Sequence, residues 1–305
     1  MQDRIDFMFN KVKLFSHIIK STQNWFSVTL GHPSGNTEFK TRFRNGREEK
    51  IIIHFAPNKI ISDAKRVYRK HGLIYTINAV RRNVWAVCTR FFRSIRCFFW
   101  PGRFKLNDIY FEYSCHPDIW RNERRVEVPI ALAVVKEAQI KGLNILEVGN
   151  VLWRYGGSGY DVLDKYEVQK GIINEDIVSY IPKKKYDIII SVSTFEHVGW
   201  DENEYGGKSS NGQGKLLLGI DNLIKNCLVD RGEIFFTVPI GYNPQLNLYI
   251  ETNKLNTYSC RFLLRKSFNR WCEASWDEVK NVKFNFPFPF ANAILIGRIK
   301  KQETN

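Results

Sequence analysis

A glycine, several acidic residues and a Glu-His pair follow one another through the middle of this sequence, each directly after a predicted strand. The first group is Gly149, with Asn150 beside it and Glu147 two residues earlier. A glycine that follows a strand lets a ligand approach the backbone closely, because it has no side chain. Glu147 is placed either to orient this loop or to accept a hydrogen bond from a ligand amine.

Further polar residues occupy equivalent positions after the next three predicted strands. Asp164 follows the second strand, where one carboxylate suits the two adjacent hydroxyl donors of a ribose. Asp176 follows a short third strand, where an acid can meet an adenine amino group. Ser193, Glu196 and His197 follow the fourth strand. Because histidine titrates near neutral pH, His197 is the first candidate for a general base and Glu196 the second. Each residue alone is more often part of a turn or a cap, so the hypothesis depends on their order.

Alternating strands and helices are expected to position these residues. Strands are predicted at residues 143–148, 160–163, 186–192 and 233–239, with a short third strand just before Asn174, and helices at 121–141 and 213–228. Such alternation indicates an α/β fold with a Rossmann-like, mostly parallel sheet and flanking helices. Ligands of such sheets bind at the carboxyl ends of the strands, near the point where the strand order reverses. The candidate residues above all fall at that edge.

Three local features add detail to this prediction. The apolar stripe of the first helix consists of Val126, Ile130, Ala133, Val134 and Ala138, and Gly142 ends the helix. Only ten residues separate Gly149 from Tyr160, so the helix of this crossover must be reduced to about one turn. Residues 279–284 and 293–299 are predicted to form a pair of strands at one edge of the sheet.

The positive charge of the chain is concentrated in its first third. Residues 1–105 contain 21 Lys and Arg against 6 Asp and Glu, whereas residues 106–305 contain 25 of each kind. This asymmetry predicts a basic N-terminal region, residues 1–105, followed by an α/β domain, residues 106–305. Residues 37–44 and 48–55 predict a β-hairpin around Asn45-Gly46, and residues 1–30 are compatible with a helix.

Residues 77–100 predict a basic amphipathic helix. Its apolar and aromatic side chains share one face, and Arg82, Arg90, Arg93 and Arg96 share the opposite face. Such a helix either packs its apolar face on the rest of the protein or lies on an anionic membrane surface. Nucleic acid is the least favoured partner, because no DNA- or RNA-binding motif accompanies the charge.

Composition is that of an ordinary soluble protein, with 44% hydrophobic and 25% charged residues. No uncharged apolar run reaches the roughly 18 residues that a membrane-spanning helix needs. Six scattered cysteines without a CxxC motif predict reduced thiols and a cytoplasmic location, peripheral to the membrane if residues 77–100 bind lipid. Cys115-His116 lacks a second pair at ligand spacing, so no metal site is expected.

Five segments occur in the order of the motifs of class I methyltransferases, which use S-adenosylmethionine, and the chain resembles that family over residues 104–300. The segments are Ile145–Asn150, Val162–Glu167, Ile173–Ile177, Tyr186–Trp200 and Phe236–Pro244. More narrowly, Trp120–Arg124 together with Glu147–Leu152 resembles a group of microbial methyltransferase-like proteins. Trp25-Phe26 and Phe39–Gly46 weakly resemble the N-terminal parts of FkbM-type, glycan-linked methyltransferases.

The resemblance implies a binding site for S-adenosylmethionine. Its residues would be Glu147, Gly149, Asn150, Asp164, Asp176, Ser193 and Arg121, the last pairing with the methionine carboxylate. The reaction implied is methyl transfer to a small-molecule or saccharide acceptor, with an oxygen nucleophile favoured and His197 or Glu196 as the base. The loop has one glycine where these enzymes commonly have two or three. A non-catalytic scaffold that binds a membrane surface or an acidic partner is therefore the alternative.

Overall fold

The computed structural model describes residues 37–42, 48–53, 102–201, 212 and 214–303. The chain forms two compact units, residues 1–89 and 90–305. In the first unit, β1 (Thr37–Arg42) pairs antiparallel with β2 (Glu48–Ile53), so the predicted hairpin is confirmed. The helices predicted within residues 1–30 and 77–100 lie outside the described residues. The division into two functional parts at residue 105 stays a prediction.

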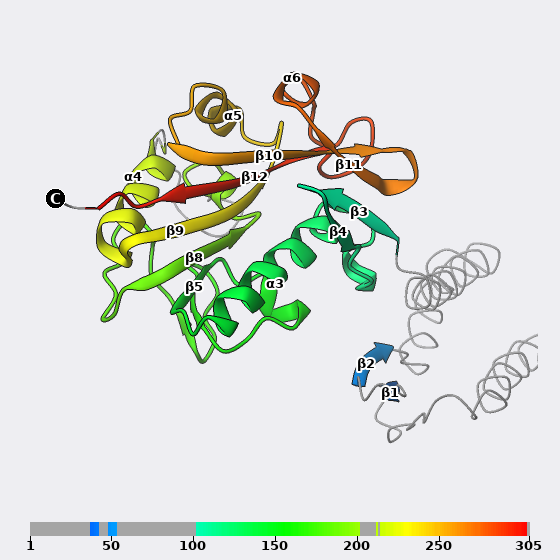
Figure 1. Ribbon diagram of the computed structural model, residues 1–305, viewed down its shortest axis with the longest axis horizontal. Helices are drawn as coiled ribbons and strands as arrows, with labels where there is room; N and C mark the ends of the chain where they lie inside the picture. Colours follow the sequence, from blue (N-terminus) through cyan, green and yellow to red (C-terminus); the bar gives the residue numbers. More distant parts are fainter. Residues whose placement is uncertain (1–36, 43–47, 54–101, 202–211, 213, 304–305) are drawn as a thin grey trace, which may run out of the picture. The chain divides into compact units, whose positions relative to one another are not determined.

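The second unit is built on an eight-stranded sheet with the order β11-β10-β12-β9-β8-β5-β6-β7 (Figure 1). The strands are β5 (Ile145–Val148), β6 (Asp161–Leu163), β7 (Ile172–Ile173), β8 (Tyr186–Val192), β9 (Leu228–Pro239), β10 (Thr257–Lys266), β11 (Arg270–Ala274) and β12 (Ala293–Lys300). Neighbours from β7 to β9 are parallel, and β12, β10 and β11 add antiparallel pairs. The predicted Rossmann-like, mostly parallel sheet with flanking helices is confirmed. Because the strand order reverses between β5 and β8, ligands are expected at the carboxyl ends of these strands.

Two hydrophobic cores cover the two faces of this sheet. On one face, α3 (Arg124–Ile140) packs together with the hairpin of β3 (Arg103–Leu106) and β4 (Ile109–Glu112). On the other face lie α4 (Lys215–Asn222), its π-helical continuation η5 (Leu223–Cys227), α5 (Pro244–Glu251) and α6 (Trp276–Val279). Successive residues of β8 alternate between the cores, with Ile188 and Ile190 in the first and Ile189 in the second. The central strands are therefore buried on both faces, as parallel strands are when helices cover both sides.

Helix α3 confirms the predicted helix and its stop but corrects its buried face. Gly142 follows the helix with a φ of +68°, a conformation that glycine adopts without strain. Ala133 is exposed, so the predicted stripe is wrong at this position, whereas Val134 is half-buried and packs against this core. The face that meets the sheet instead includes Val128, Ala131 and Val135 beside the predicted Val126, Ile130 and Ala138.

The strand pair predicted near the C-terminus is wrong in two respects. Residues 276–279 form α6, which begins with a capping box between Ser275 and Glu278, and a loop follows it. β12 is a strand as predicted, but it lies between β9 and β10 rather than at an edge. The outer strands β10 and β11 have no counterpart among the predicted elements.

The cysteines also require a correction. Cys115 is disulfide-bonded. The expectation of reduced thiols is therefore wrong for Cys115, whereas Cys227, Cys260 and Cys272 are free. Within the described ranges, no helix combines the length and the apolar character needed to cross a bilayer. The location of the protein in the cell stays a prediction.

Candidate functional site

The loop after β5 is shaped around Gly149. Its φ is +83°, and its amide donates to the Leu163 carbonyl at 2.8 Å, next to the pairing of β5 with β6. A Cβ at this position would lie 2.2 Å from Oγ1 of Thr194, in the turn after β8. Glycine is therefore required twice, by the backbone conformation and by the close approach of two loops. These loops meet where the strand order reverses.

Glu147 is fully buried in β5 and holds this loop in place. Its Oε1 accepts hydrogen bonds from the amides of Val151 at 2.8 Å and Leu152 at 2.7 Å. The second amide starts η2 (Leu152–Tyr155), a single 3-10 turn that ends at Gly156. The short helix predicted for this crossover is confirmed. Glu147 orients the loop, and its contact with a ligand amine stays a prediction.

Burial of Glu147 makes stability depend on pH. Burial raises the pKa of Glu147 to about 7 from an ordinary 4.5, although hydrogen bonds from Leu152 and Val151 oppose the shift. The folded chain therefore keeps a proton that the unfolded chain releases. The stabilisation is complete below about pH 4.5 and is lost as the pH rises to about 7. We expect this group to lower the free energy of unfolding by up to about 3 kcal/mol over that interval, measured by urea denaturation.

Two matched variants test this pH dependence. Glu147→Gln keeps an oxygen acceptor for the loop amides but does not titrate, so its free energy of unfolding should vary less with pH. Glu175 is exposed, and Glu175→Gln should leave the pH dependence of the wild type unchanged. Parallel pH profiles for the wild type and Glu147→Gln would contradict the role given to this carboxyl group.

Asp164, directly after β6, joins two loops through backbone amides. Its Oδ2 accepts from the Asn150 amide at 3.2 Å. Its Oδ1 accepts from the amides of Tyr166 at 2.9 Å and Glu167 at 2.8 Å. A carboxylate offers about four lone-pair positions, so three amide donors leave room for a hydroxyl donor. The structure therefore brings Gly149, Asn150 and Asp164 together.

Asp176, shortly after β7, is held by two lysines. Its Oδ2 lies 2.9 Å from Nζ of Lys165 and 3.0 Å from Nζ of Lys215, and its Oδ1 accepts from the Val178 amide at 3.1 Å. Burial disfavours the charged carboxylate, but these hydrogen bonds outweigh burial and hold the pKa of Asp176 below its usual value. The two lysines add positive charge here. The contact of Asp176 with an adenine amino group stays a prediction.

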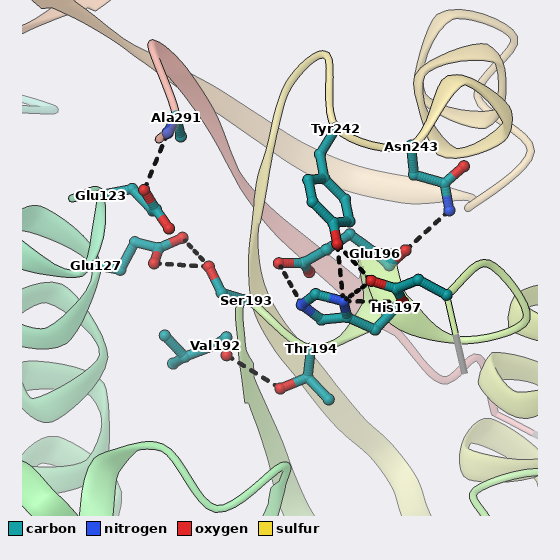
Figure 2. A network of polar contacts seen from close by, with 11 residues as sticks. Glu123, Glu127, Val192, Ser193, Thr194, Glu196, His197, Tyr242, Asn243 and Ala291 are labelled. Carbon is teal, nitrogen blue, oxygen red and sulfur yellow. Dashed lines mark hydrogen bonds and ion pairs between the residues drawn. The ribbon is translucent and has the colours of Figure 1, made fainter. Parts of the chain in front are cut away.

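The turn after β8 leaves ordinary backbone geometry at Ser193. Its φ is +43°, which is uncommon for a residue with a side chain. Its hydroxyl lies 2.9 and 2.8 Å from the two carboxyl oxygens of Glu127 in α3 (Figure 2). Both residues are buried, so this hydroxyl serves the contact with the helix. The turn leads directly into η3 (Phe195–His197), which carries the predicted Glu-His pair.

Three side chains surround His197: those of Glu196 and Tyr242, which Figure 2 shows beside it, and that of Asp201. Nδ1 of His197 lies 2.8 Å from Oδ2 of Asp201, and the Tyr242 hydroxyl donates to the same carboxylate. Nε2 of His197 lies 3.7 Å from Oε1 of Glu196, beyond hydrogen-bond distance. The rings of His197 and Tyr242 meet edge to face, with centroids 5.2 Å apart. Because a carboxylate only accepts, Asp201 favours a proton on Nδ1 and makes Nε2 the acceptor nitrogen of the neutral ring.

Glu196 belongs to a buried group of carboxyls that also includes Glu127 and Glu123. Glu196 is 2% exposed, and its Oε2 has no hydrogen-bond partner among the described residues. Burial, followed by the charge of Glu127, holds the pKa of Glu196 well above its usual value. Burial, followed by the charge of Glu123, raises the pKa of Glu127 to about 7. The shift favours the protonated form of Glu196, which places no second negative charge beside His197.

The structure separates one predicted residue from the others and adds two. Arg121 is exposed in the turn before α3 and forms no hydrogen bond or ion pair with any other described residue. Its pairing with a ligand carboxylate stays a prediction. Asp201 and Tyr242 belong to the His197 cluster but are missing from the sequence-based site. The available signals were an acid four residues after the histidine and a tyrosine just beyond the end of β9.

This arrangement is suited to removing a proton from a ligand bound at the sheet edge. His197 is oriented through one ring nitrogen, and its other nitrogen lies 3.7 Å from the carboxyl of Glu196, whose pKa is raised. Among the residues that the structure describes, no three side chains of metal-ligating type form a group that could hold a metal ion.

Comparisons with known proteins give structural neighbours only. No protein-family model and no curated protein matches the chain. The N-methyltransferase NodS from Bradyrhizobium japonicum, in complex with S-adenosyl-L-homocysteine, is similar with a TM-score of 0.36 and 13% identity, over 61% of this chain and 91% of NodS. A TehB-like SAM-dependent methyltransferase from Corynebacterium glutamicum gives 0.31 and 16%, over 57% and 88%. An rRNA methylase from Escherichia coli gives 0.30 and 11%, over 81% and 92%. Similarity at this level assigns the chain to no family.

Proposed function

We propose that the chain transfers a methyl group from S-adenosylmethionine to an acceptor bound beside His197. One observation carries the proposal: the Gly149 loop meets the turn that bears Glu196 and His197, where the order of a parallel sheet reverses. At such an edge, a tight backbone turn can hold the nucleoside of the cofactor. A proton-accepting side chain beside it can then serve the methyl acceptor. The acceptor we propose is a small molecule or a saccharide with an oxygen nucleophile.

The residues at this edge fit the proposed cofactor and its acceptor in one respect each. Asp164 keeps acceptor capacity after binding three amides, as a ribose hydroxyl would require. The unpartnered Oε2 of buried Glu196 is a polar atom of the kind that a bound ligand satisfies. We therefore assign cofactor contacts to Gly149, Asn150, Asp164, Asp176 and Arg121. Glu147 shapes the loop after β5. Ser193 shapes the turn that leads to Glu196 and His197.

The sheet topology supports the same proposal. β12 inserts antiparallel between β9 and β10, and β10 consequently runs in the same direction as β9. The carboxyl ends of β8, β9 and β10 therefore lie at one edge of the sheet, where the candidate residues also lie. β11 extends the arrangement by one further antiparallel strand.

His197 is the general base in the proposed mechanism. When bound, S-adenosylmethionine supplies an electrophilic methyl group on a sulfonium sulfur. Nε2 of His197 accepts the proton of the acceptor hydroxyl as the oxygen attacks, and Asp201 stabilises the imidazolium through Nδ1. The Tyr242 hydroxyl holds the Asp201 carboxylate in this position. Glu196, neutral and 3.7 Å from Nε2, offers the acceptor a hydrogen bond without adding charge.

Formation of S-adenosylhomocysteine with a panel of hydroxylated small molecules and saccharides tests the proposal. Turnover that depends on one of these acceptors supports it. Amines in the same panel test the nucleophile, since turnover with amines alone would move the assignment from oxygen to nitrogen. If no product forms and the cofactor does not bind, the alternative hypothesis is favoured. In that hypothesis the chain is a non-catalytic scaffold that binds an acidic partner or, through residues 77–100, a membrane surface.

A further inference from the structure

Three phenylalanine side chains stand exposed at the same edge of the sheet as the candidate site. Phe268 is 92% exposed, Phe286 68% and Phe290 42%. Phe268 lies in the turn from β10 to β11, and the other two lie in the loop that leads into β12. Because β10 runs parallel to β9 and β12 runs opposite, both connections lie at the carboxyl edge of the parallel strands. We call these three side chains the aromatic rim.

The loop that carries Phe286 and Phe290 is held by two asparagines. Asn292, which is 2% exposed, donates through its side-chain amide to the carbonyls of Phe288 at 2.8 Å and Phe290 at 3.1 Å. The backbone amide of Asn285 donates to the Phe290 carbonyl at 2.9 Å, and the side-chain Oδ1 of Asn285 accepts from the backbone amide of Phe290 at 2.6 Å. The exposure of both rings is therefore built into a hydrogen-bonded loop.

The turn that carries Phe268 is anchored on its inner side. The guanidinium of Arg125 donates to the Asn269 carbonyl at 3.2 Å, and the Asn269 side chain donates to the Trp120 carbonyl. Phe268 has a φ of +59°, a conformation that costs roughly 1–2 kcal/mol in a residue with a side chain. Backbone strain at an exposed aromatic residue indicates that its side chain has a binding role rather than a role in stabilising the fold.

Exposed cations lie beside the aromatic rim, and one of them, Lys266, is near the carboxylate of Glu278. Lys266 and Arg270 flank Phe268, and Lys283 precedes the loop; all three are exposed, and none forms an ion pair in the part of the chain that the structure describes. Arg265, near the end of β10, donates to the Pro289 carbonyl at 2.7 Å and so joins this strand to the loop. Aromatic rings among cations match an anionic lipid surface, where rings enter the interface and cations stay with the headgroups.

We propose that the aromatic rim docks the candidate site on an anionic lipid surface. Phe284, in the same loop, meets the Tyr242 ring edge to face, with the ring centroids 4.8 Å apart. The Tyr242 ring in turn contacts His197. Docking through the rim therefore brings the candidate base to the lipid interface, and the methyl acceptor is one that is presented there. The docking stands without methyl transfer; the statement about the acceptor rests on the proposed function.

Flotation of the purified full chain with phosphatidylcholine vesicles, with and without phosphatidylserine, tests the docking. The basic N-terminal region can attract anionic vesicles by charge alone, so binding is measured at low and at high ionic strength, where salt screens that attraction. The variant carries Phe268→Ser, Phe286→Ser and Phe290→Ser. At high ionic strength we expect it to bind anionic vesicles at least about tenfold more weakly than the wild type, because ring burial is lost.

A matched control carries serine at three exposed apolar positions elsewhere: Ile140, Leu218 and Leu248. We expect its vesicle binding to stay within about twofold of the wild type. Equal vesicle binding by the rim variant and the wild type would overturn the proposal, and so would an equal loss in the control. Circular dichroism melting shows whether both variants fold.

Titration of the same proteins with S-adenosylmethionine separates the two proposals. A rim variant that binds the cofactor but not the vesicles supports docking through the rim. A wild type that docks through the rim but binds no cofactor leaves the docking standing and removes methyl transfer.

Discussion

Replacing Gly149 by alanine is expected to lower the free energy of unfolding by about 2–5 kcal/mol. A positive φ strains any residue with a Cβ, and the new methyl group would lie 2.2 Å from Oγ1 of Thr194. The loops after β5 and β8 would have to move apart, so we also expect S-adenosylmethionine to bind at least about tenfold more weakly. Urea denaturation and isothermal titration measure the two effects.

Gly171 provides the matched control for this substitution. Its φ is +93°, and a Cβ there would meet nothing within 4 Å. Gly171→Ala therefore carries the backbone strain alone, with an expected cost of about 1–2 kcal/mol and no effect on cofactor affinity. Equal destabilisation by Gly149→Ala and Gly171→Ala would contradict the close approach of the two loops. Adding Thr194→Gly to Gly149→Ala should restore part of the lost stability.

Replacing His197 by glutamine is expected to reduce kcat about 100- to 10,000-fold, the range that a positioned general base contributes. Glutamine keeps a polar side chain beside Asp201 and Glu196 but accepts no proton near neutral pH. Affinity for S-adenosylmethionine should remain within about twofold of the wild type, because the cofactor contacts lie on other loops. Turnover on the acceptor found in the panel, together with isothermal titration, gives both values.

Variants of the two neighbours of His197 show whether it acts as a base. Asp201→Asn should also lower kcat, because an amide no longer favours the tautomer with Nδ1 protonated. Tyr242→Phe keeps the ring contact with Phe284 but loses the hydroxyl contacts with Asp201 and with Nδ1 of His197, and its effect should be the smallest of the three. Wild-type turnover in His197→Gln would rule out the proposed base.

The parallel half of the sheet is predictable from sequence, whereas in the antiparallel half only β12 is predicted as a strand. β8 coincides with its predicted range because its isoleucines are buried on both faces and form an unbroken apolar run. β10 is mostly half-exposed, and Arg261 and Arg265 interrupt its apolar pattern. The strand predicted at residues 279–284 is wrong because a capping box at Ser275 and Glu278 starts a helix just before it.

The positions of the site residues follow from strand order, but their partners do not. Gly149 and Asp164 lie close together because parallel strands end at one edge of the sheet. The contacts of the site side chains depend on how segments that are distant in the sequence pack together. The Ser193 hydroxyl bonds to Glu127, 66 residues away, and Tyr242 approaches His197 from 45 residues away. No local pattern carries that information.

Isothermal titration of the full chain with S-adenosylmethionine and with S-adenosylhomocysteine, at two temperatures, tests the cofactor site most directly, because it needs no acceptor. We expect one molecule of each ligand to bind per chain. The affinity should fall in Asp164→Asn, which weakens the acceptor proposed for the ribose hydroxyl, and should be unchanged in Glu175→Gln at the exposed Glu175. No heat of binding with either ligand at either temperature would contradict the claim that this edge of the sheet binds the cofactor.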